Sequence, residues 1–194
     1  IPEDSLGKES WEPDFKQYAV VIQNTNNINN DKLRWPRRVE KELEAYVNNG
    51  GGLYVLHSAN NAFLHWDEYN KMIGLGWRPQ NFGYALEIKN DKSIVRIPPG
   101  EGQHTGHGKR FDAIIQQLTA HPINKGYPQK WKTANTEVDY YPRGSAQNIT
   151  VLSYAYDSSV THQYWPVEWV VKYVKGNVYT SSLGHLWQGE KDPV

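Results

Sequence analysis

The stretch GGGLYVLHSANNAF, residues 50–63, decides the fold that we predict for this chain. Its three glycines close a preceding helix, because glycine tolerates the left-handed conformation found at helix C-termini. Residues 53–57 are typical of a short buried strand, and a polar loop begins at Ser58. Ligands of open α/β sheets bind outside the carboxyl ends of the strands, so we expect this strand to deliver His57 and Ser58 to a binding crevice.

The residues before this stretch complete a β-α-β unit. Residues 18–23 form a short run rich in β-branched side chains, which is typical of a buried parallel strand. Pro36 fits the first turn of a helix, and Val39, Leu43 and Val47 recur on one face of that helix. Because such units are right-handed and place their two strands in parallel, the sequence predicts an α/β fold with a parallel sheet.

The rest of the chain supplies further strands and few helices. We expect a helix over residues 66–73 and an undecided strand or helix over residues 111–118. Further strands are expected at residues 84–89, 93–97 and 149–156, with a hairpin over residues 167–174 and 178–182. That hairpin ends in SLGHLW, which places His185 just beyond a strand, as His57 is.

Composition narrows the class of protein. The 194 residues suit one domain, residues 1–194, and 21 basic residues balance 21 acidic ones, which argues against nucleic-acid and membrane-surface partners. No apolar run is as long as a bilayer span, and the first residues lack signal-peptide features, so cytoplasm and periplasm both stay open. The absence of cysteine excludes disulfides and a cysteine nucleophile. Eight Trp and thirteen Tyr suit either a large core or stacking on sugar rings.

Histidines and one glutamate are the candidates for acid–base chemistry. His57 is the first choice, because its ordinary pKa lies near neutral pH and its place at a strand end is well defined. His185 is the second, and Glu137 is expected to lie opposite them, unless it is a solvated loop charge. Three imidazoles, from His57, His107 and His185, could instead hold Zn²⁺ or a similar divalent ion. Ser58 lacks the G-x-S-x-G context of a serine nucleophile.

A set of motifs in order along the chain resembles the trehalose-utilisation (ThuA-like) family. The set comprises GGGLYVLHSANNAF, TGHG, HPINKGYPQKW, a downstream Glu, NITVLSYAY and KGNVYTSSLGH. The resemblance implies a flavodoxin-like fold of the class I glutamine-amidotransferase type, with an open, mostly parallel sheet and helices on both faces. It also implies a role in bacterial carbohydrate catabolism, close to sugar dehydrogenases that make 3-keto sugars.

The resemblance also implies site residues. The family's H-S pair falls on His57 and Ser58, its G-H-G on His107 and its neighbours, its H-P-I on residues 121–123 and its L-G-H on residues 183–185. Where relatives read D-E-L-Y, this chain has T-E-V-D, which keeps only Glu137. The amidotransferase cysteine is missing, so glutamine hydrolysis is not expected. Relatives have a further strand and helix before residue 18 and a helix after the L-G-H block, and exposed sheet edges would favour a homo-oligomer.

The sequence therefore predicts a domain that binds a small carbohydrate at the carboxyl ends of its strands. We expect an enzyme that hydrolyses, eliminates or isomerises a glycoside or 3-keto sugar. A carbohydrate-binding or regulatory module without chemistry and a metal-dependent hydrolase are the alternatives. The catalytic candidates are His57, His107, Glu137 and His185. The substrate-binding candidates are Asn24, Ser58, Asn60, Trp66, Trp77, His121 and Trp187.

Overall fold

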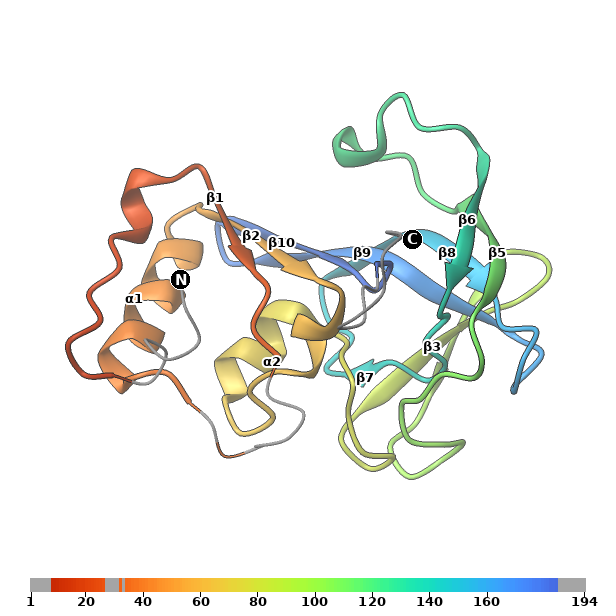
Figure 1. Ribbon diagram of the computed structural model, residues 1–194, viewed down its shortest axis with the longest axis horizontal. Coiled ribbons are helices and arrows are strands. Elements are labelled where there is room, and N and C mark those ends of the chain that lie inside the picture. Colours follow the sequence, from red (N-terminus) through yellow and green to blue (C-terminus); the bar gives the residue numbers. More distant parts are fainter. Residues whose placement is uncertain (1–7, 27–31, 33, 185–194) are drawn as a thin grey trace.

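The computed structural model describes residues 8–26, 32 and 34–184 (Figure 1). Its helical elements are η2 (Phe15–Gln17), α1 (Arg37–Asn48), η3 (His57–Asn61), α2 (Asp67–Ile73) and η4 (Pro122–Asn124). Its strands are β1 (Val20–Gln23), β2 (Gly52–Leu56), β3 (Tyr84–Ile88), β4 (Ile94–Ile97), β5 (Phe111–Gln117), β6 (Lys130–Thr136), β7 (Arg143–Gly144), β8 (Ile149–Tyr156), β9 (Tyr164–Tyr173) and β10 (Gly176–Ser181). The predicted strands and the two predicted α-helices are all present, and the undecided segment at residue 111 is a strand.

The described strands form one mixed sheet with the order β1-β2-β10-β9-β8-β5-β6, and β3 branches from β9 to pair with β4 and β7. The predicted β1-α1-β2 unit is present, with β1 and β2 parallel. The prediction of a mostly parallel, flavodoxin-like sheet needs correction. Only β1, β2 and β10 pair in parallel in the part of the sheet that is described, and the other pairings are antiparallel.

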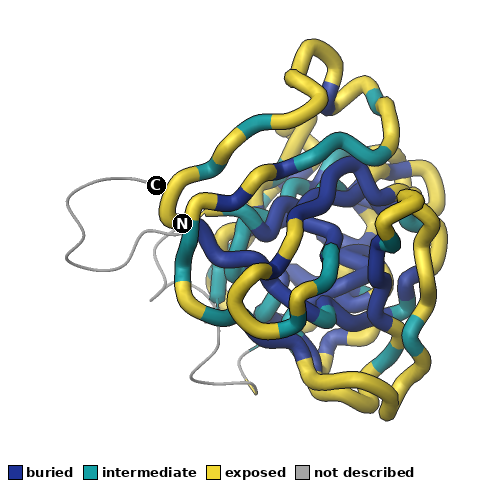
Figure 2. The backbone as a smooth tube through the Cα atoms, turned by 90° about the vertical axis from the view of Figure 1, so that its right-hand side faces the viewer, coloured by how far each residue is buried: buried dark blue, intermediate teal, exposed yellow. Residues whose placement is uncertain are grey.

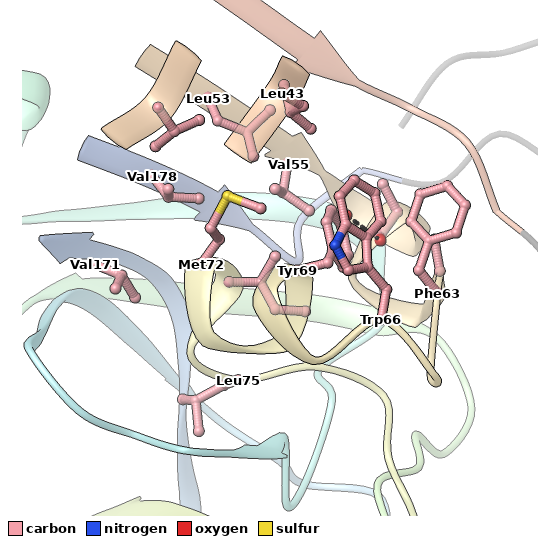
Figure 3. Close-up of a cluster of buried hydrophobic side chains, with 14 of the residues drawn as sticks. Leu43, Leu53, Val55, Phe63, Trp66, Tyr69, Met72, Leu75, Val171 and Val178 are labelled. Carbon is pink, nitrogen blue, oxygen red and sulfur yellow. Dashed lines mark hydrogen bonds between the residues drawn. The ribbon is translucent and has the colours of Figure 1, made fainter. Parts of the chain in front are cut away.

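The helices α1 and α2 share one face of the parallel strands, where the larger of two core clusters lies (Figure 3). Leu53 of β2 and Val178 of β10 are register partners on that face, and Leu43 of α1 and Met72 of α2 pack in the same cluster. These four side chains are at most 2% exposed. Burial of each such side chain contributes roughly 1.5–3 kcal/mol, so this layer anchors the N-terminal part of the sheet.

Neither α1 nor α2 covers the opposite face of the parallel strands, and that face is most exposed at the edge strand β1. Val20 and Ile22 of β1 alternate with the residues of the core face, and they are 53% and 62% exposed. The prediction of helices on both faces is therefore wrong for the described part of the chain. The reason is that the helix-poor second half contributes strands and loops, not crossover helices.

A second core cluster lies among β3, β5, β8 and β9, with Trp165 and Val167 at its centre. Figure 2 shows buried segments concentrated in the interior of the molecule, with exposed loops around it. The β5-β6 hairpin extends from this part and ends in the turn that holds η4 (Figure 1). Within the described ranges, no helix combines the length and apolar character needed to cross a membrane.

Candidate active site

His57 occupies a strained position at the carboxyl end of β2. It is the first residue of η3, and its φ of 45° lies in the left-handed region that non-glycine residues rarely adopt. Such a conformation costs about 1–3 kcal/mol and persists where the surrounding structure imposes it, often at functional sites. The loop that the sequence predicted after β2 is therefore a tight strand-to-helix turn that presents one imidazole.

A hydrogen bond fixes the tautomer of that imidazole. The Nδ1 atom of His57 lies 2.7 Å from the main-chain oxygen of Ser182, just after β10. Because a carbonyl oxygen can only accept, Nδ1 carries the proton and donates it. In the neutral ring, Nε2 therefore holds the lone pair, which is the form that general-base chemistry requires.

Gly184, the glycine of the L-G-H block, lies close to His57. Gly184 has a φ of +110°, and a Cβ atom built on it would lie 4.0 Å from the His57 Cβ atom. The parallel pairing of β2 and β10 explains this contact, because it brings the ends of both strands to the same edge of the sheet. His185 and Trp187 lie outside the described residues, so their predicted places in the site are untested.

A second group of side chains comes from residues 137–140, after β6. Val138 and Tyr140 belong to the core cluster around Trp165. Glu137 and Asp139 alternate with them in sequence, and both are 6% exposed. The alternative reading of Glu137 as a solvated loop charge is thus wrong, because its carboxyl group is buried beside an arginine and a histidine.

His107 and Arg110 supply those partners. His107 Nε2 lies 3.6 Å from Glu137 Oε2, and Arg110 Nε lies 3.6 Å from Glu137 Oε1. The His107 Nδ1 atom donates to the Gly108 oxygen at 2.8 Å, so Nε2 pairs with the carboxylate when it is protonated. The His107 side chain is 33% exposed and that of Glu137 only 6%, so the imidazole lies between the buried carboxylate and solvent.

Trp77 and Asn60 connect this group with η3. The Trp77 ring packs edge-on against the His107 ring at 5.5 Å, and the Trp77 amide donates to the Asn60 oxygen at 3.3 Å. The Asn60 side chain hydrogen-bonds the Asp139 carboxyl group. The short helix η3 begins at His57 and also holds Asn60, so it is the element that links His57 to the group around Asp139.

The electrostatic character of the site is set mainly by Asp139. Burial raises the pKa of this carboxyl group to about 7, and the Glu137 charge adds to the rise. The charge of His107 and the hydrogen bond from Asn60 act in the opposite direction. A carboxyl group that titrates near neutral pH beside an imidazole can hold or release a proton under working conditions.

Two glycines allow His107 to reach this position. A Cβ atom on Gly106 would lie 2.5 Å from the Tyr140 hydroxyl oxygen. A Cβ atom on Gly108 would overlap the Ser159 hydroxyl oxygen and lie 2.8 Å from Val160 Cγ2. The G-H-G sequence thus reflects close packing of the loop on residues 140 and 159–160.

Replacing Gly108 by alanine should destabilise the protein by about 2 kcal/mol, as expected for an overpacked position. The measurement is urea unfolding of Gly108→Ala, Ser159→Gly and the double variant. Because Ser159 causes the main overlap, the effect of Gly108→Ala should shrink by half or more in the Ser159→Gly background. Equal effects in both backgrounds would show that the overlap is not the cause.

Several predicted substrate-binding residues lie elsewhere or have other roles. Trp66 is 1% exposed, packs on Phe63 and Tyr69, and donates from Nε1 to Glu44 Oε1 at 2.9 Å. The prediction that Trp66 stacks on a sugar is therefore wrong, because its ring is part of the core. His121 caps η4 by accepting from the Ile123 amide, at the end of the β5-β6 hairpin remote from residues 110 and 137.

The remaining candidates lie at strand ends. Asn24 follows β1 and is exposed, whereas Ser58 and Asn60 follow His57 in η3. Asn60 is 2% exposed, and its hydrogen bond with Asp139 gives it a role inside the site. Nothing in these contacts tests whether any of the three binds substrate.

A metal site is not defined by the described residues. Among them, no group of three or more His, Asp or Glu side chains has an arrangement that could hold an ion. The three-histidine site proposed from the sequence includes His185, which lies outside the described ranges, so it stays a prediction. His107 faces Glu137, and His57 donates to Ser182.

Sequence reasoning missed Asp139 and Arg110. The usable signal for Asp139 was its position two residues after Glu137, the carboxylate that the sequence had singled out. Arg110 lies three residues after His107, and only the folded loop shows that both side chains approach one carboxylate.

Fold and site together define an α/β protein with a histidine–carboxylate group at one edge of a mixed sheet. A sequence model of the ThuA family, described as trehalose utilisation, matches residues 8–193. The chain therefore belongs to the ThuA, or trehalose-utilisation, family, as its motifs predicted.

Solved structures agree with this assignment. A protein described as ThuA-like from Parabacteroides merdae is 29% identical, with a TM-score of 0.79 over 89% of this chain and 62% of that one. Another, from Bacteroides uniformis, is 18% identical, with a TM-score of 0.57 over 88% of this chain and 62% of that one, and it supports the fold alone. This chain thus spans less than two thirds of either relative. Comparison with curated proteins gave no match.

Proposed function

We propose that this protein is an enzyme of carbohydrate catabolism that acts on a glycoside or 3-keto sugar by acid–base chemistry. The observation that carries the proposal is the geometry of His57. A strained turn places its imidazole at the carboxyl end of β2, and the hydrogen bond to Ser182 puts the proton of the neutral ring on Nδ1 and the lone pair on Nε2. A base held in this way suits proton removal next to a keto group, which acidifies the neighbouring C–H bond.

The His107–Glu137 pair supplies the partner in this scheme. Protonated His107, held by the Glu137 carboxylate, donates a proton to the leaving oxygen or to the developing alkoxide. Trp77 lies against the His107 ring and offers an aromatic surface for one face of a sugar. His185, adjacent to Gly184, is the further histidine that the family resemblance adds to the site. Elimination and isomerisation begin with this proton removal, whereas in hydrolysis the same base would take its proton from the attacking water, and the proposal covers all three.

The test is a screen of disaccharides and their 3-keto derivatives with product analysis, followed by His57→Asn. Asparagine tolerates the left-handed conformation and can still donate to Ser182, but it cannot act as the base. Turnover should fall at least about 100-fold, the usual contribution of a general base. His104→Asn, at an exposed loop position, is the matched control and should keep full turnover.

The outcomes separate the alternatives. Undiminished turnover by His57→Asn would remove His57 as the base. Sugar binding without any turnover, lost in Trp77→Ala and unchanged in His57→Asn, would favour a carbohydrate-binding module. Loss of wild-type activity on chelation, together with stoichiometric zinc by elemental analysis, would favour the metal-dependent hydrolase.

A further inference from the structure

The loop that joins β8 to β9, residues 157–163, has no part in the acid–base scheme above, although it lies against the loop that carries His107. Gly108 is the point of contact, because a Cβ atom on it would overlap the Ser159 hydroxyl oxygen and lie 2.8 Å from Val160 Cγ2. The His107 ring is in turn bonded to this glycine, since its Nδ1 atom donates to the Gly108 oxygen at 2.8 Å. The place of Gly108 therefore helps to set the place of the imidazole.

One buried carboxylate shapes the side of the β8–β9 loop that meets Gly108. Asp157 is 0% exposed, and its two oxygens accept five hydrogen bonds of 2.7–3.2 Å from residues of the same loop. Oδ1 accepts from the Ser159 amide and hydroxyl and from the Val160 amide, and Oδ2 accepts from the amide and hydroxyl of Thr161. Because hydrogen bonds to an ionised acceptor are about twice as strong as neutral ones, this carboxylate fixes the positions of all three residues.

The rest of the β8–β9 loop is attached to the second core cluster. Trp165, which is 0% exposed at the centre of that cluster, donates from Nε1 to the Thr161 hydroxyl at 2.8 Å. The Asp157 amide donates to the Gln163 oxygen at 2.8 Å, so the two ends of the loop are joined as well. The loop is therefore a base of fixed shape, and the surface that it offers to Gly108 depends on the Asp157 carboxylate.

We propose that Asp157 is a positioning residue for His107. Its carboxylate holds the β8–β9 loop in the shape on which Gly108 packs. This packing keeps the centre of the His107 ring 5.5 Å from that of the Trp77 ring, and its Nε2 atom 3.6 Å from Glu137 Oε2. The inference rests on the proposed function for the role of His107 as the acid. The position of the ring is a separate matter, and it can be measured without substrate.

The test is the nuclear Overhauser contact between the His107 and Trp77 rings in the full chain, measured by NMR at one fixed pH. The wild type should show cross-peaks between the two rings, because they pack edge-on. Asp157→Ala removes all five acceptor contacts, so most of the cross-peak intensity should be lost. Asp157→Asn keeps one acceptor oxygen but cannot accept from both sets of donors, so its loss of intensity should be smaller.

Leu43→Ala is the matched control for a general loss of stability. It opens a cavity in the larger core cluster, on α1, and should keep the cross-peaks at full intensity. Far-UV circular dichroism checks that each variant is folded. The proposal is overturned if the wild type shows no cross-peaks, if folded Asp157→Ala keeps their full intensity, or if Leu43→Ala loses them to the same extent. Should Asp157→Ala not fold, full intensity in Asp157→Asn overturns it.

A second readout applies to any substrate that the screen above identifies. In Asp157→Ala, kcat and kcat/KM should fall together by about 10-fold or more, because a misplaced acid weakens stabilisation of the transition state and not substrate binding. Leu43→Ala should keep both constants near the wild-type values, and a change in KM alone in Asp157→Ala would contradict the positioning role. The NMR result needs no turnover, so its failure leaves the His57→Asn test standing, and failure of that test leaves the NMR result standing.

Discussion

Replacing Arg143 by alanine should lower the free energy of unfolding by about 4 kcal/mol, the largest effect that we expect from a single side chain. The guanidinium group is fully buried and donates to the main-chain oxygens of residues 83, 98, 101 and 103. Alanine would leave these acceptors without their donor and would open a cavity. Because these carbonyls belong largely to the loop that leads to His107, the variant should also loosen the site.

The measurement is urea unfolding of Arg143→Ala beside two controls. Arg143→Lys keeps the charge but not the planar fork of donors, so its loss should be intermediate. Arg96→Ala removes an exposed arginine that donates to Ala146 at 2.7 Å, and it should cost under about 1 kcal/mol. Equal losses for Arg143→Ala and Arg96→Ala would mean that burial of the guanidinium group does not matter.

The free energy of unfolding should depend on pH through the titration of Asp139. Its folded pKa of about 7 lies above the ordinary value of 3.8, so the folded protein binds this proton more tightly than the unfolded chain does. The stabilising contribution of the proton is complete below about pH 4 and is lost as the pH rises through 7. Three pH units correspond to about 4 kcal/mol, an upper bound for the loss by pH 8.

Asp139→Asn removes this titration while keeping a side chain of the same shape. The variant should match the wild type near pH 4 and exceed its stability by about 2–4 kcal/mol at pH 8. Urea midpoints across that range provide the measurement, and Asp112→Asn, at a carboxylate whose pKa is lowered, should not reproduce the gain. Parallel curves for the wild type and Asp139→Asn would contradict a protonated, buried Asp139.

The local elements could be predicted from the sequence because each has its own signal. The apolar spacing of Val39, Leu43 and Val47 predicted α1, and the β-branched runs predicted β1 and β8. The pairing of these strands could not be predicted as well. A buried strand has the same apolar composition whether its neighbours are parallel or antiparallel, so the extrapolation from β1-α1-β2 to a parallel sheet failed after β2.

The site was predictable in part for a similar reason. The position of His57 at a strand end predicted its place in the site. The family motifs predicted His107 and Glu137, whose Nε2 and Oε2 atoms lie 3.6 Å apart. Burial depends on tertiary packing, so the sequence could not show that Trp66 is in the core whereas Trp77 lies against His107. Tertiary packing also buries Asp139, which could not be predicted from the residue type because aspartate is usually exposed.

The position of β10 has a consequence for biosynthesis. Within the described sheet, β2 and β9 are joined only through β10, which a ribosome makes after both of them. The segment from β1 to α2 therefore cannot complete its part of the sheet until synthesis reaches residue 181. Until then, Leu53 and Val55 lack their neighbours on β10. A nascent chain stalled before that residue should be cleaved readily by proteases and should bind chaperones. It should become resistant to proteolysis once β10 has paired with β2 and β9.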